Sequence, residues 1–394
     1  LLDAVLVNGA AAHALELDDG HTLGSAHPGA VVVPAVFGVA EKLGSSMSAV
    51  LEAIIVGYEV MLSIASAIHP RSRRRGFHNT AVAGVFGAAA SAAKLLGLDA
   101  HEVCSCLGLA GSFAGGLLAF WNPGEKGGTD VKKLHPGKAA RDGVLCAVAA
   151  AEGLRGPKSV FEGRAGVFSA FAGGDCMLKV PDVSMQEPEI MSVYFKPWPC
   201  CRSLHGPIAL AIELRHQIAG RTDEIASVRV DTYSLASERS SRRAEGDDAQ
   251  FSIPVAVATA FLAGDVSYDR LVGARADPAI YSLAERVSVD EDPEFSARYP
   301  SARPARLTVV MRDGTCFSAE LEYPPGEPES PLPEHLLRDK FVGLCCPVIG
   351  RHRALELLHC LAEGGLEFAC RDLLSLSCKE VVCPEASGTQ MGVP

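Results

Sequence analysis

An excess of basic residues is absent from this sequence: 36 Lys and Arg stand against 47 Asp and Glu, a formal net charge of −11. Binding of nucleic acid without sequence preference needs a strongly basic face, so this class of function is not expected. A small anionic substrate remains compatible with the composition, because the cations that line a pocket act on a ligand more strongly than the total charge does.

Paired Cys-x-x-Cys motifs are also absent, although the chain has 13 cysteines. Neighbours such as Cys104 and Cys106 stand too close together for a zinc ribbon. A chain of 394 residues is long enough to bury a core without disulfides, so we expect reduced, mostly buried thiols and a cytoplasmic location. Residues 345–383 combine six cysteines with His352 and His359, and plain core thiols are favoured there over a metal site.

Neither a signal peptide nor an unbroken membrane-spanning run is visible. Residues 103–124 carry no charge and are long enough to cross a bilayer, but glycine, serine, asparagine and proline interrupt them. A buried helix of a large bundle is therefore favoured over a membrane span. The chain begins with Leu1 rather than Met, and we expect it to be trimmed or partial at this end.

The composition, 48% hydrophobic and 21% charged, is that of a folded protein, and the length suggests two domains. The first part, to about residue 175, is rich in Ala and Gly. Apolar residues recur there at helical spacing in residues 3–17, 48–68 and 80–96. Small residues on many faces let helices approach closely, so this part is predicted to pack helix on helix.

The second part mixes helix and strand patterns. Residues 227–233 alternate like a strand, and residues 306–311 and 316–322 flank an Asp-Gly turn, which predicts a hairpin. Residues 191–325 are therefore expected to form a smaller α+β unit. A Pro/Glu-rich linker leads to helices from residue 334 onward, which are expected to return to the first domain. No internal repeat is present.

The residues that could carry chemistry lie in four polar islands. The first combines His13, Asp18, Asp19 and His21 at the end of the first expected helix, and His27 follows it. Carboxylates beside imidazoles raise the pKa of the rings or fix their tautomers, which is typical of an acid–base site. A hydrated helix end is the structural alternative, and the density of histidines favours the functional interpretation.

The other islands are basic or rich in cysteine. Four arginines within residues 71–75 precede His78, and Lys132 stands three residues before His135. A basic segment ahead of a helix N-terminus attracts anions, whereas a solvated basic turn or an ordinary helix start remains the alternative. Residues 200–205 open the second unit, where a pocket between domains is expected, although a helix start with buried thiols is slightly favoured there.

In this order, the islands resemble the motifs of the MmgE/PrpD family, which includes 2-methylcitrate dehydratase, cis-aconitate decarboxylase and iminodisuccinate epimerase. The resemblance runs from Asn8 to about Glu322. The shared motifs are Asn-Gly at 8–9, the His-Ala-Leu-Glu-Leu-Asp-Asp-Gly-His run at 13–21, His-Pro-Gly at 27–29, Gly-Tyr-Glu-Val at 57–60, Gly-Phe-His at 76–78, Lys-Lys-Leu-His-Pro-Gly at 132–137, Lys-Pro-Trp-Pro-Cys at 196–200 and Phe-Ser-Ile-Pro at 251–254.

The resemblance implies a mainly α fold: a large all-helical domain with an inserted smaller α+β lid domain. The helical domain would comprise residues 1–190 and 326–394, lacking the first helices of a typical member, and the lid residues 191–325. A homodimer, no cofactor, no metal and an active site between the domains are also implied. The catalytic residues carried over are Asp18, Asp19, His27, His78, Lys132 and His205. Substrate-binding residues are expected at His21, Arg75, His135 and Arg202.

Four positions depart from the family pattern. Glu16 stands where Asp is common, and Gly20 stands where a hydroxyl residue often follows the Asp-Asp pair. Val255 stands where Tyr is common, which removes a proton donor, and Cys201 stands where some decarboxylase-like members carry His. These departures argue against assuming decarboxylase chemistry.

We therefore expect a cofactor-independent lyase that moves a proton at a carbon next to a carboxylate of a small di- or tricarboxylate. A hydro-lyase like 2-methylcitrate dehydratase is the favoured interpretation. The alternatives are a cis-aconitate decarboxylase-like or iminodisuccinate epimerase-like enzyme, a metal-dependent hydratase, and an inactive member that only binds ligand. The small polycarboxylate is the expected partner, with neither nucleic acid nor a membrane.

Overall fold

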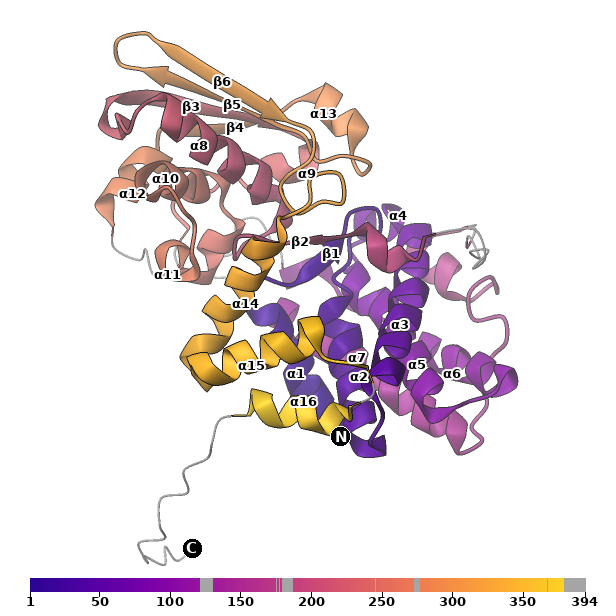
Figure 1. The fold of residues 1–394 in the computed structure, drawn as a ribbon. Coiled ribbons are helices and arrows are strands. Elements are labelled where there is room, and N and C mark those ends of the chain that lie inside the picture. The colour runs from indigo at the N-terminus through magenta and orange to yellow at the C-terminus, as the bar shows by residue number, and fades with distance from the viewer. Residues whose placement is uncertain are drawn as a thin grey trace, which may run out of the picture.

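The computed structural model describes residues 1–120, 130–174, 176, 178, 187–244, 246–272, 277–366 and 368–378. Helices dominate these residues, and a small sheet lies in the second half of the chain (Figure 1). The mainly α fold class is therefore confirmed. Cys383, part of the cysteine-rich segment, lies outside the described residues.

The first part of the chain is a helical bundle. Its helices are α1 (Leu2–Ala14), α2 (Gly29–Leu43), α3 (Met47–Ile68), α4 (Arg71–Arg74), α5 (Asn79–Leu96), α6 (Ala100–Phe113) and α7 (Val131–Ala151). The helices expected at 3–17, 48–68 and 80–96 correspond to α1, α3 and α5. Helix α1 ends earlier than expected, because Glu16 adopts a left-handed backbone conformation with φ of 55°.

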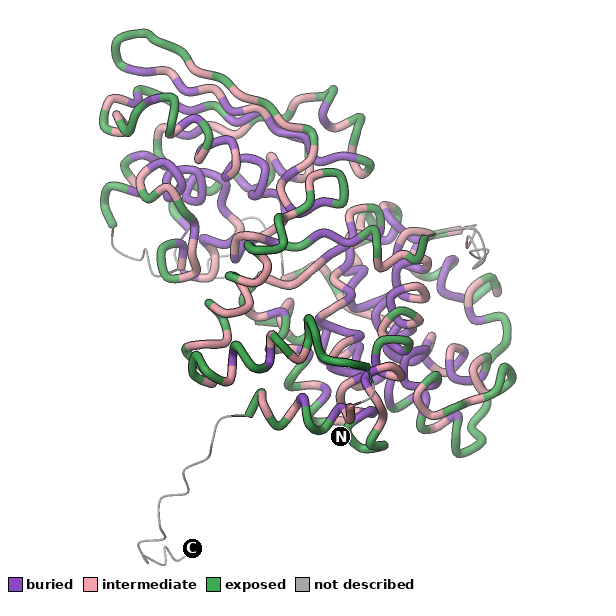
Figure 2. The backbone as a smooth tube through the Cα atoms, viewed as in Figure 1, coloured by how far each residue is buried: buried purple, intermediate pink, exposed green. Residues whose placement is uncertain are grey.

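Small residues set the spacing of the bundle. A Cβ on Gly9 of α1 would lie 2.6 Å from the Gly137 Cα of α7, so these two helices cross in direct contact. A Cβ on Gly143 would likewise lie 2.6 Å from the Val85 carbonyl oxygen of α5. Figure 2 shows the resulting buried centre of the bundle. The crossing of α1 and α7 brings the C-terminal end of α1 close to the first turns of α7, which carry Lys132 and His135.

The second part holds a four-stranded sheet of β3 (Ile225–Thr232), β4 (Val287–Glu291), β5 (Ala305–Met311) and β6 (Cys316–Leu321), in the order β4-β3-β5-β6. Strands β3 and β4 are parallel, and the other pairs are antiparallel. The predicted strand at 227–233 and the predicted hairpin are thus confirmed, and Gly314 takes the left-handed conformation that its turn requires. The hairpin pairs Thr308 with Ser318.

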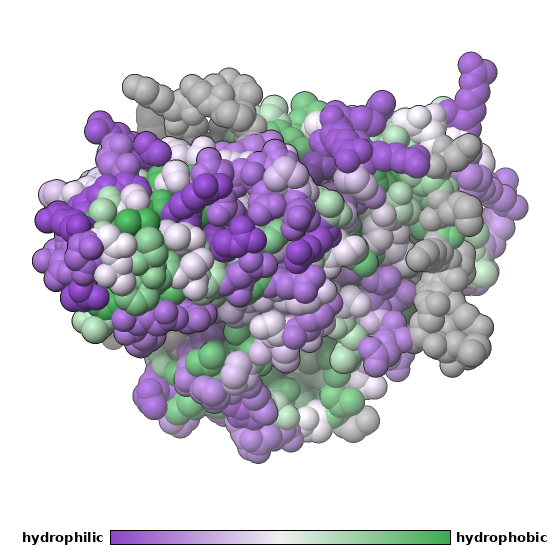
Figure 3. All heavy atoms as spheres, turned by 90° about the horizontal axis from the view of Figure 1, so that it is seen from above, coloured by the Kyte–Doolittle hydropathy of each residue, from purple (hydrophilic) through white to green (hydrophobic). Residues whose placement is uncertain are grey.

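Helices cover one side of this sheet (Figure 1). The longer ones are α8 (His205–Gln217), α10 (Ile253–Ala263) and α12 (Pro278–Ala284), and the short ones are α9 (Ser234–Ser237), α11 (Tyr268–Leu271) and α13 (Pro293–Arg298). Their apolar residues and the inner face of the sheet form a hydrophobic cluster of their own. The outer surface of this part, seen from above in Figure 3, is mainly hydrophilic with scattered apolar side chains.

Two connections join the parts. Strand β1 (Asp19–His21) follows α1 and pairs with β2 (Val193–Phe195), which precedes the second part. After the sheet, α14 (Glu334–Ile349), α15 (Arg351–Glu363) and α16 (Cys370–Ser377) return to the bundle (Figure 1). The Cys370 amide donates to the Ser45 carbonyl at 2.9 Å, and Leu357 and Leu373 join the bundle core. The domain limits at 190 and 326, and a movable lid, stay predictions.

Two helices of the bundle, α3 and α5, are long and apolar enough to cross a membrane by length and composition. The apolar window of α5 is 83% buried within the protein and that of α3 is 44% buried, and both helices pack in the bundle core. The uncharged stretch 103–124 forms no long helix in its described part, because α6 ends at Phe113. It contributes instead to the bundle, as predicted.

Candidate active site

The segment after α1 carries two carboxylates, Glu16 and Asp18, that contact imidazole and ammonium groups. The Asp18 Oδ2 atom lies 2.5 Å from His13 Nδ1 and 3.3 Å from His27 Nδ1, and Asp18 Oδ1 accepts from Lys196 Nζ at 2.9 Å. Burial opposes ionisation of Asp18, but its contacts with His13, His27 and the Lys196 ammonium hold its pKa well below the usual range. Asp18 is therefore an anion that orients the rings beside it.

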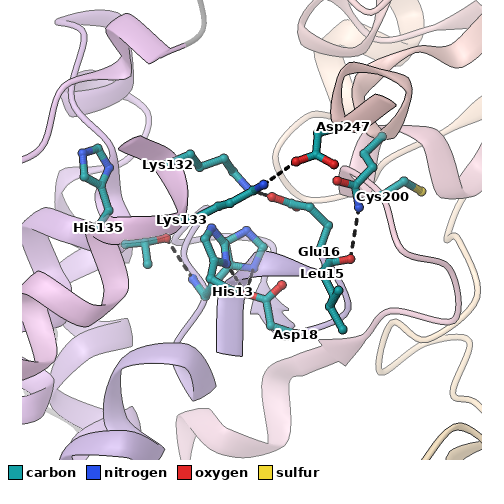
Figure 4. Close-up of polar contacts among 12 residues, drawn as sticks. His13, Leu15, Glu16, Asp18, Lys132, Lys133, His135, Cys200 and Asp247 are labelled. Carbon is teal, nitrogen blue, oxygen red and sulfur yellow. Dashed lines mark hydrogen bonds and ion pairs between the residues drawn. The ribbon is translucent and has the colours of Figure 1, made fainter. Parts of the chain in front are cut away.

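Glu16 joins two lysines from different parts of the chain, and Figure 4 shows its contact with one of them, Lys132. Its Oε1 pairs with Lys132 Nζ from α7, and its Oε2 lies 3.1 Å from Lys196 Nζ. Burial, together with the Lys196 ammonium, lowers the pKa of Lys132 well below its usual value, although Cys201 opposes this shift. Burial opposes the charge of Lys196 too, but Asp18 raises its pKa overall. Lys132 is therefore the more acidic of the two ammonium groups.

Four imidazoles form a row behind these charges. The ring centroids of His13 and His27 are 5.0 Å apart, those of His13 and His78 are 6.4 Å apart, and those of His78 and His135 are 5.2 Å apart. Burial lowers the pKa of all four rings, that of His13 to about 3, so these imidazoles are neutral at neutral pH. The Asp19 carbonyl lies 2.7 Å from His27 Nδ1 and can only accept, which puts the proton on Nδ1 and leaves the lone pair on Nε2.

Asp19 has a structural task. Its side chain accepts from the Tyr58 hydroxyl at 2.6 Å and from the Gly29 amide at 2.9 Å. Burial raises the pKa of Asp19 in spite of these hydrogen bonds. The carboxyl thus fastens β1 to the start of α2 and to α3, and it does not line the pocket described next.

A pocket of about 670 Å³, its mouth included, opens between the two parts of the chain. The bundle and its loops contribute Glu16, Ser25, His27, Arg73, His78, Leu118, Phe120 and Lys132. Tyr194 of β2 and residues of the second part complete the lining: Cys201, Arg202, Ser203, Leu235, Arg239, Phe251 and Arg303. Five of the lining side chains are cationic and one is a carboxylate, so the pocket is suited to a small polyanion.

The structure brings four of the predicted site residues to this pocket: His27, His78, Lys132 and Arg202. Asp18 lies directly behind His27. Arg202 itself is largely occupied, because its Nε and Nη2 atoms donate to Glu327 Oε1 at 2.9 and 2.8 Å. Its guanidinium also stacks over the Tyr194 ring at 4.4 Å. Arg202 is therefore better placed to shape the wall than to bind a substrate.

Other predicted residues lie outside the lining. Asp19 is one, as described above. His135 lies behind two lining residues: its Nδ1 atom is 2.9 Å from His78 Nδ1, and its ring packs edge-on against Phe120 with the ring centroids 5.6 Å apart. His21 contacts Glu189 at 3.3 Å.

His205 and Arg75 face elsewhere as well. His205 begins α8, where it is buried against Trp198 with its Nε2 atom 3.3 Å from the Cys200 carbonyl. Arg75 is exposed and donates to the Ala170 carbonyl at 3.3 Å. Its neighbour Arg73 reaches the pocket instead, because the short helix α4 turns the two side chains in different directions.

Sequence reasoning missed several lining residues, above all Arg73, Arg239, Arg303 and Tyr194. Lys196 is the first residue of the Lys-Pro-Trp-Pro-Cys motif at 196–200. A lysine in a motif shared with an enzyme family is a signal that could have identified it as a site residue. Cys201 lies in the fourth polar island, where a buried thiol is slightly favoured, and it is also one of the departures from the family pattern. Burial opposes its ionisation, but Arg239, the Ser203 amide and Lys132 lower the pKa of the Cys201 thiol to about 7.

The structure accounts for two of the sequence departures. A Cβ on Gly20 would collide with the Tyr194 hydroxyl, which faces it across the β1–β2 pair. Tyr194 therefore supplies a hydroxyl where the side chain of residue 20 would have stood. Val255 is fully buried in α10 and does not line the pocket. Burial raises the pKa of Tyr194, so its hydroxyl stays neutral.

Three side chains could hold a metal ion. One ligand atom each from His13, Asp18 and His27 lie within 4.8 Å of one another. The Lys196 ammonium already occupies Asp18 at 2.9 Å, so a cation would have to displace this charge. Within the described part of the chain, the C-terminal cysteines and histidines form no comparable group.

Comparisons with known proteins agree with this geometry. The family models of the MmgE/PrpD N-terminal and C-terminal domains match residues 1–178 and 198–363. The chain is 29% identical over 378 residues to the cis-aconitate decarboxylase-like protein oryM of Aspergillus oryzae, covering 89% of this chain and 77% of that protein. It is 28% identical over 358 residues to the human cis-aconitate decarboxylase, covering 86% and 71%. The cis-aconitate decarboxylase of Aspergillus terreus is 27% identical over 389 residues, with 90% and 76% covered. The chain belongs to the MmgE/PrpD family.

Proposed function

We propose that this chain is a cofactor-independent lyase that moves a proton at a carbon next to a carboxylate of a small di- or tricarboxylate. The observation that carries the proposal is the pocket itself, in which two imidazoles, a buried ammonium group and several guanidinium groups surround one cavity. Family membership supports an enzyme of lyase or decarboxylase type.

The cations of the pocket serve to hold the carboxylate arms of the substrate. Fixing two arms orients the reacting carbon toward the imidazoles. The reacting groups are then already in position, which lowers the entropic cost of the reaction. The apolar side chains Leu118, Phe120, Leu235 and Phe251 complete the lining and limit the water around the bound ligand.

His27 and His78 are the groups that exchange the proton. Both rings are neutral in the empty pocket because burial lowers the pKa of each. A bound polyanion raises the pKa of an imidazole beside it, so the ring takes up a proton as the substrate enters. General acid–base catalysis of this kind contributes on the order of 10²–10⁴ in rate.

Lys132 stabilises the charge that develops on the substrate. Moving a proton or losing CO₂ next to a carboxylate pushes an electron pair onto that carboxylate, and a fixed ammonium group compensates the added charge. The lowered pKa of Lys132 also makes its ammonium a better proton donor than a surface lysine. Glu16 and Lys196 hold this side chain in place.

Decarboxylation of a cis-aconitate-like tricarboxylate is the first candidate reaction, because the curated relatives reported above carry this activity in their names. The bond between the CH₂ group and the departing carboxylate breaks, and CO₂ leaves. The electron pair shifts the double bond and reaches the carboxylate at its far end. The carbon next to that carboxylate then takes a proton, which completes the product.

Dehydration of a substrate like 2-methylcitrate is the second candidate, and Cys201 is the observation that favours it. Dehydration needs one group to take the proton and another to protonate the departing hydroxyl. The imidazoles belong to the bundle, whereas Cys201 belongs to the second part and lines the same pocket. A thiol with a pKa of about 7 is suited to such a second acid.

A substrate panel tests the proposal. The purified protein, dialysed exhaustively against EDTA, is incubated with cis-aconitate, citrate, 2-methylcitrate and iminodisuccinate, and the products are followed by proton NMR and CO₂ release. We expect turnover of one polycarboxylate without added metal. CO₂ with a rearranged alkene identifies decarboxylation, and an alkene without CO₂ identifies dehydration. Turnover restored only by a divalent cation would support the metal-dependent hydratase. The absence of any turnover would support the inactive member that only binds ligand.

Two further expectations concern the assembly and the location of the protein: the homodimer follows from the family, and the cytoplasmic location from the reduced thiols. We propose that the chain forms a homodimer and acts in the cytoplasm. Exposed apolar side chains on α7 (Val131, Leu134, Leu145 and Val148) support an additional protein contact on that helix.

A further inference from the structure

Arg303 is a buried cation that lines the pocket without a carboxylate partner. It is 6% exposed, its Nε donates to Thr22 Oγ1 at 3.3 Å, and its Nη1 donates to the Tyr233 hydroxyl at 3.1 Å. Among the described residues, no carboxylate lies within ion-pair distance of Arg303. Arg202 differs, since Glu327 neutralises its fork. A buried guanidinium without a counter-ion costs free energy unless an anion completes its surroundings.

Arg73 approaches the same region from the bundle. It projects from α4 into the pocket, and no carboxylate of the described residues pairs with it. Burial, followed by the charges of Arg303 and Arg73, lowers the pKa of His69 to about 3. The His69 ring is therefore neutral and adds no charge of its own. The Arg73 and Arg303 guanidinium groups therefore both influence His69, Arg73 from the bundle and Arg303 from the second part of the chain.

Neutral polar side chains line the same pocket as Arg73 and Arg303. Ser25 and Ser203 line the pocket, and the Tyr233 hydroxyl lies 3.0 Å from Ser203 Oγ. The Arg303 side chain stacks over the Tyr299 ring at 5.4 Å, which fixes the plane of its guanidinium. By contrast, the Lys132 ammonium already has Glu16 as a counter-ion. Arg73 and Arg303 therefore both bring to the pocket a positive charge that no carboxylate of the described residues pairs with.

We propose that Arg73 and Arg303 form a carboxylate subsite that selects ligands with a third carboxylate arm. The subsite rests on the proposed function and sharpens it: Lys132 serves the arm next to the reacting carbon, and the arginine pair holds an arm that takes no part in bond breaking. Guanidinium groups suit this task because their planar fork matches a carboxylate. A dicarboxylate that occupies the reacting end leaves the pair unfilled.

Binding of unreactive probes to the full chain tests this subsite. Isothermal titration compares tricarballylate, a saturated tricarboxylate, with glutarate, which lacks the third arm. In the wild-type protein, tricarballylate should bind more tightly. The variant Arg73→Met should weaken tricarballylate binding about tenfold to a hundredfold, as expected for loss of a charged hydrogen bond, and should change glutarate binding less than about threefold.

Arg74 provides the matched control. It is the next residue of α4, carries the same charge and does not line the pocket, so Arg74→Met should leave both probes unchanged. Arg303→Lys keeps the charge but loses the fork, and it should weaken tricarballylate about tenfold. Equal effects of Arg73→Met and Arg74→Met, or an equal loss of both probes in Arg73→Met, would overturn the subsite.

The outcome is independent of turnover. If no panel substrate reacts but the probes discriminate as expected, the proposed reaction fails and the subsite stands. If a substrate reacts and Arg73→Met binds tricarballylate like the wild type, the subsite fails and the reaction stands.

Discussion

Replacing Lys132 with methionine should lower kcat about 10²- to 10³-fold, the usual cost of removing a fixed group that stabilises charge in a transition state. Lys132 is the buried ammonium of the pocket, and its lowered pKa suits it to donate a proton. The fold should survive, because Lys196 still holds Glu16 at 3.1 Å. Steady-state kinetics with the substrate identified in the panel, together with a thermal melt, measures both effects.

Lys133→Met is the control for this substitution. Lys133 follows Lys132 on α7 but pairs with Asp130 and Asp247 at the edge of the site (Figure 4). Its loss should change kcat less than about threefold, as is usual for a partly exposed ion pair. A Lys132→Met protein that melts like the wild type and keeps its turnover would remove Lys132 from the mechanism.

Below about pH 6.5, the folded protein should lose stability steeply. Burial is the main cause that lowers the pKa of seven histidines, and it brings His13 and His69 to about 3 and His21 to about 4. The unfolded chain protonates these rings near pH 6.5 and the folded chain does not. The unfolded state therefore binds more protons as the pH falls, and each such ring costs about 1.4 kcal/mol per pH unit.

His13, His21 and His69 together remove about 4 kcal/mol of unfolding free energy per pH unit over the acid range. Above pH 6.5 this contribution is fully present. Urea unfolding measured between pH 7.5 and 5 should show this dependence of the unfolding free energy on pH. His69→Gln should reduce the slope by the contribution of about one bound proton. His352→Gln, whose ring is exposed on α15, should not. A stability curve that is flat between pH 6.5 and 5 would contradict the buried neutral imidazoles.

Local patterns predicted the elements of the fold well. The helical spacing of α3 and α5 and the Asp-Gly turn between β5 and β6 depend on neighbours in sequence, and the structure confirms them. The end of α1 was less predictable, because Glu16 takes the left-handed conformation where it contacts Lys132 and Lys196, which are distant in sequence.

The sequence predicted only those residues of the candidate site that lie in recognisable motifs. His27, His78 and Lys132 meet in one pocket, and their catalytic roles stay predictions. Arg73 could not be told from Arg75, because the phase of the four-residue helix α4 decides which side chain reaches the pocket. The pairing of Gly20 with Tyr194 depends on the register of β1 against β2, a contact between distant segments that spacing alone does not reveal.

The origin of the proton tests the central claim most directly. The reaction of the panel substrate is run in D₂O, and mass spectrometry with proton NMR locates deuterium in the product or the recovered substrate. When the reaction releases CO₂, or when a dehydration is run in reverse from the alkene, we expect one deuterium at the carbon next to a carboxylate, and loss of this labelling with turnover in His78→Gln. Turnover of this kind that leaves that carbon without solvent deuterium would contradict proton transfer in this pocket.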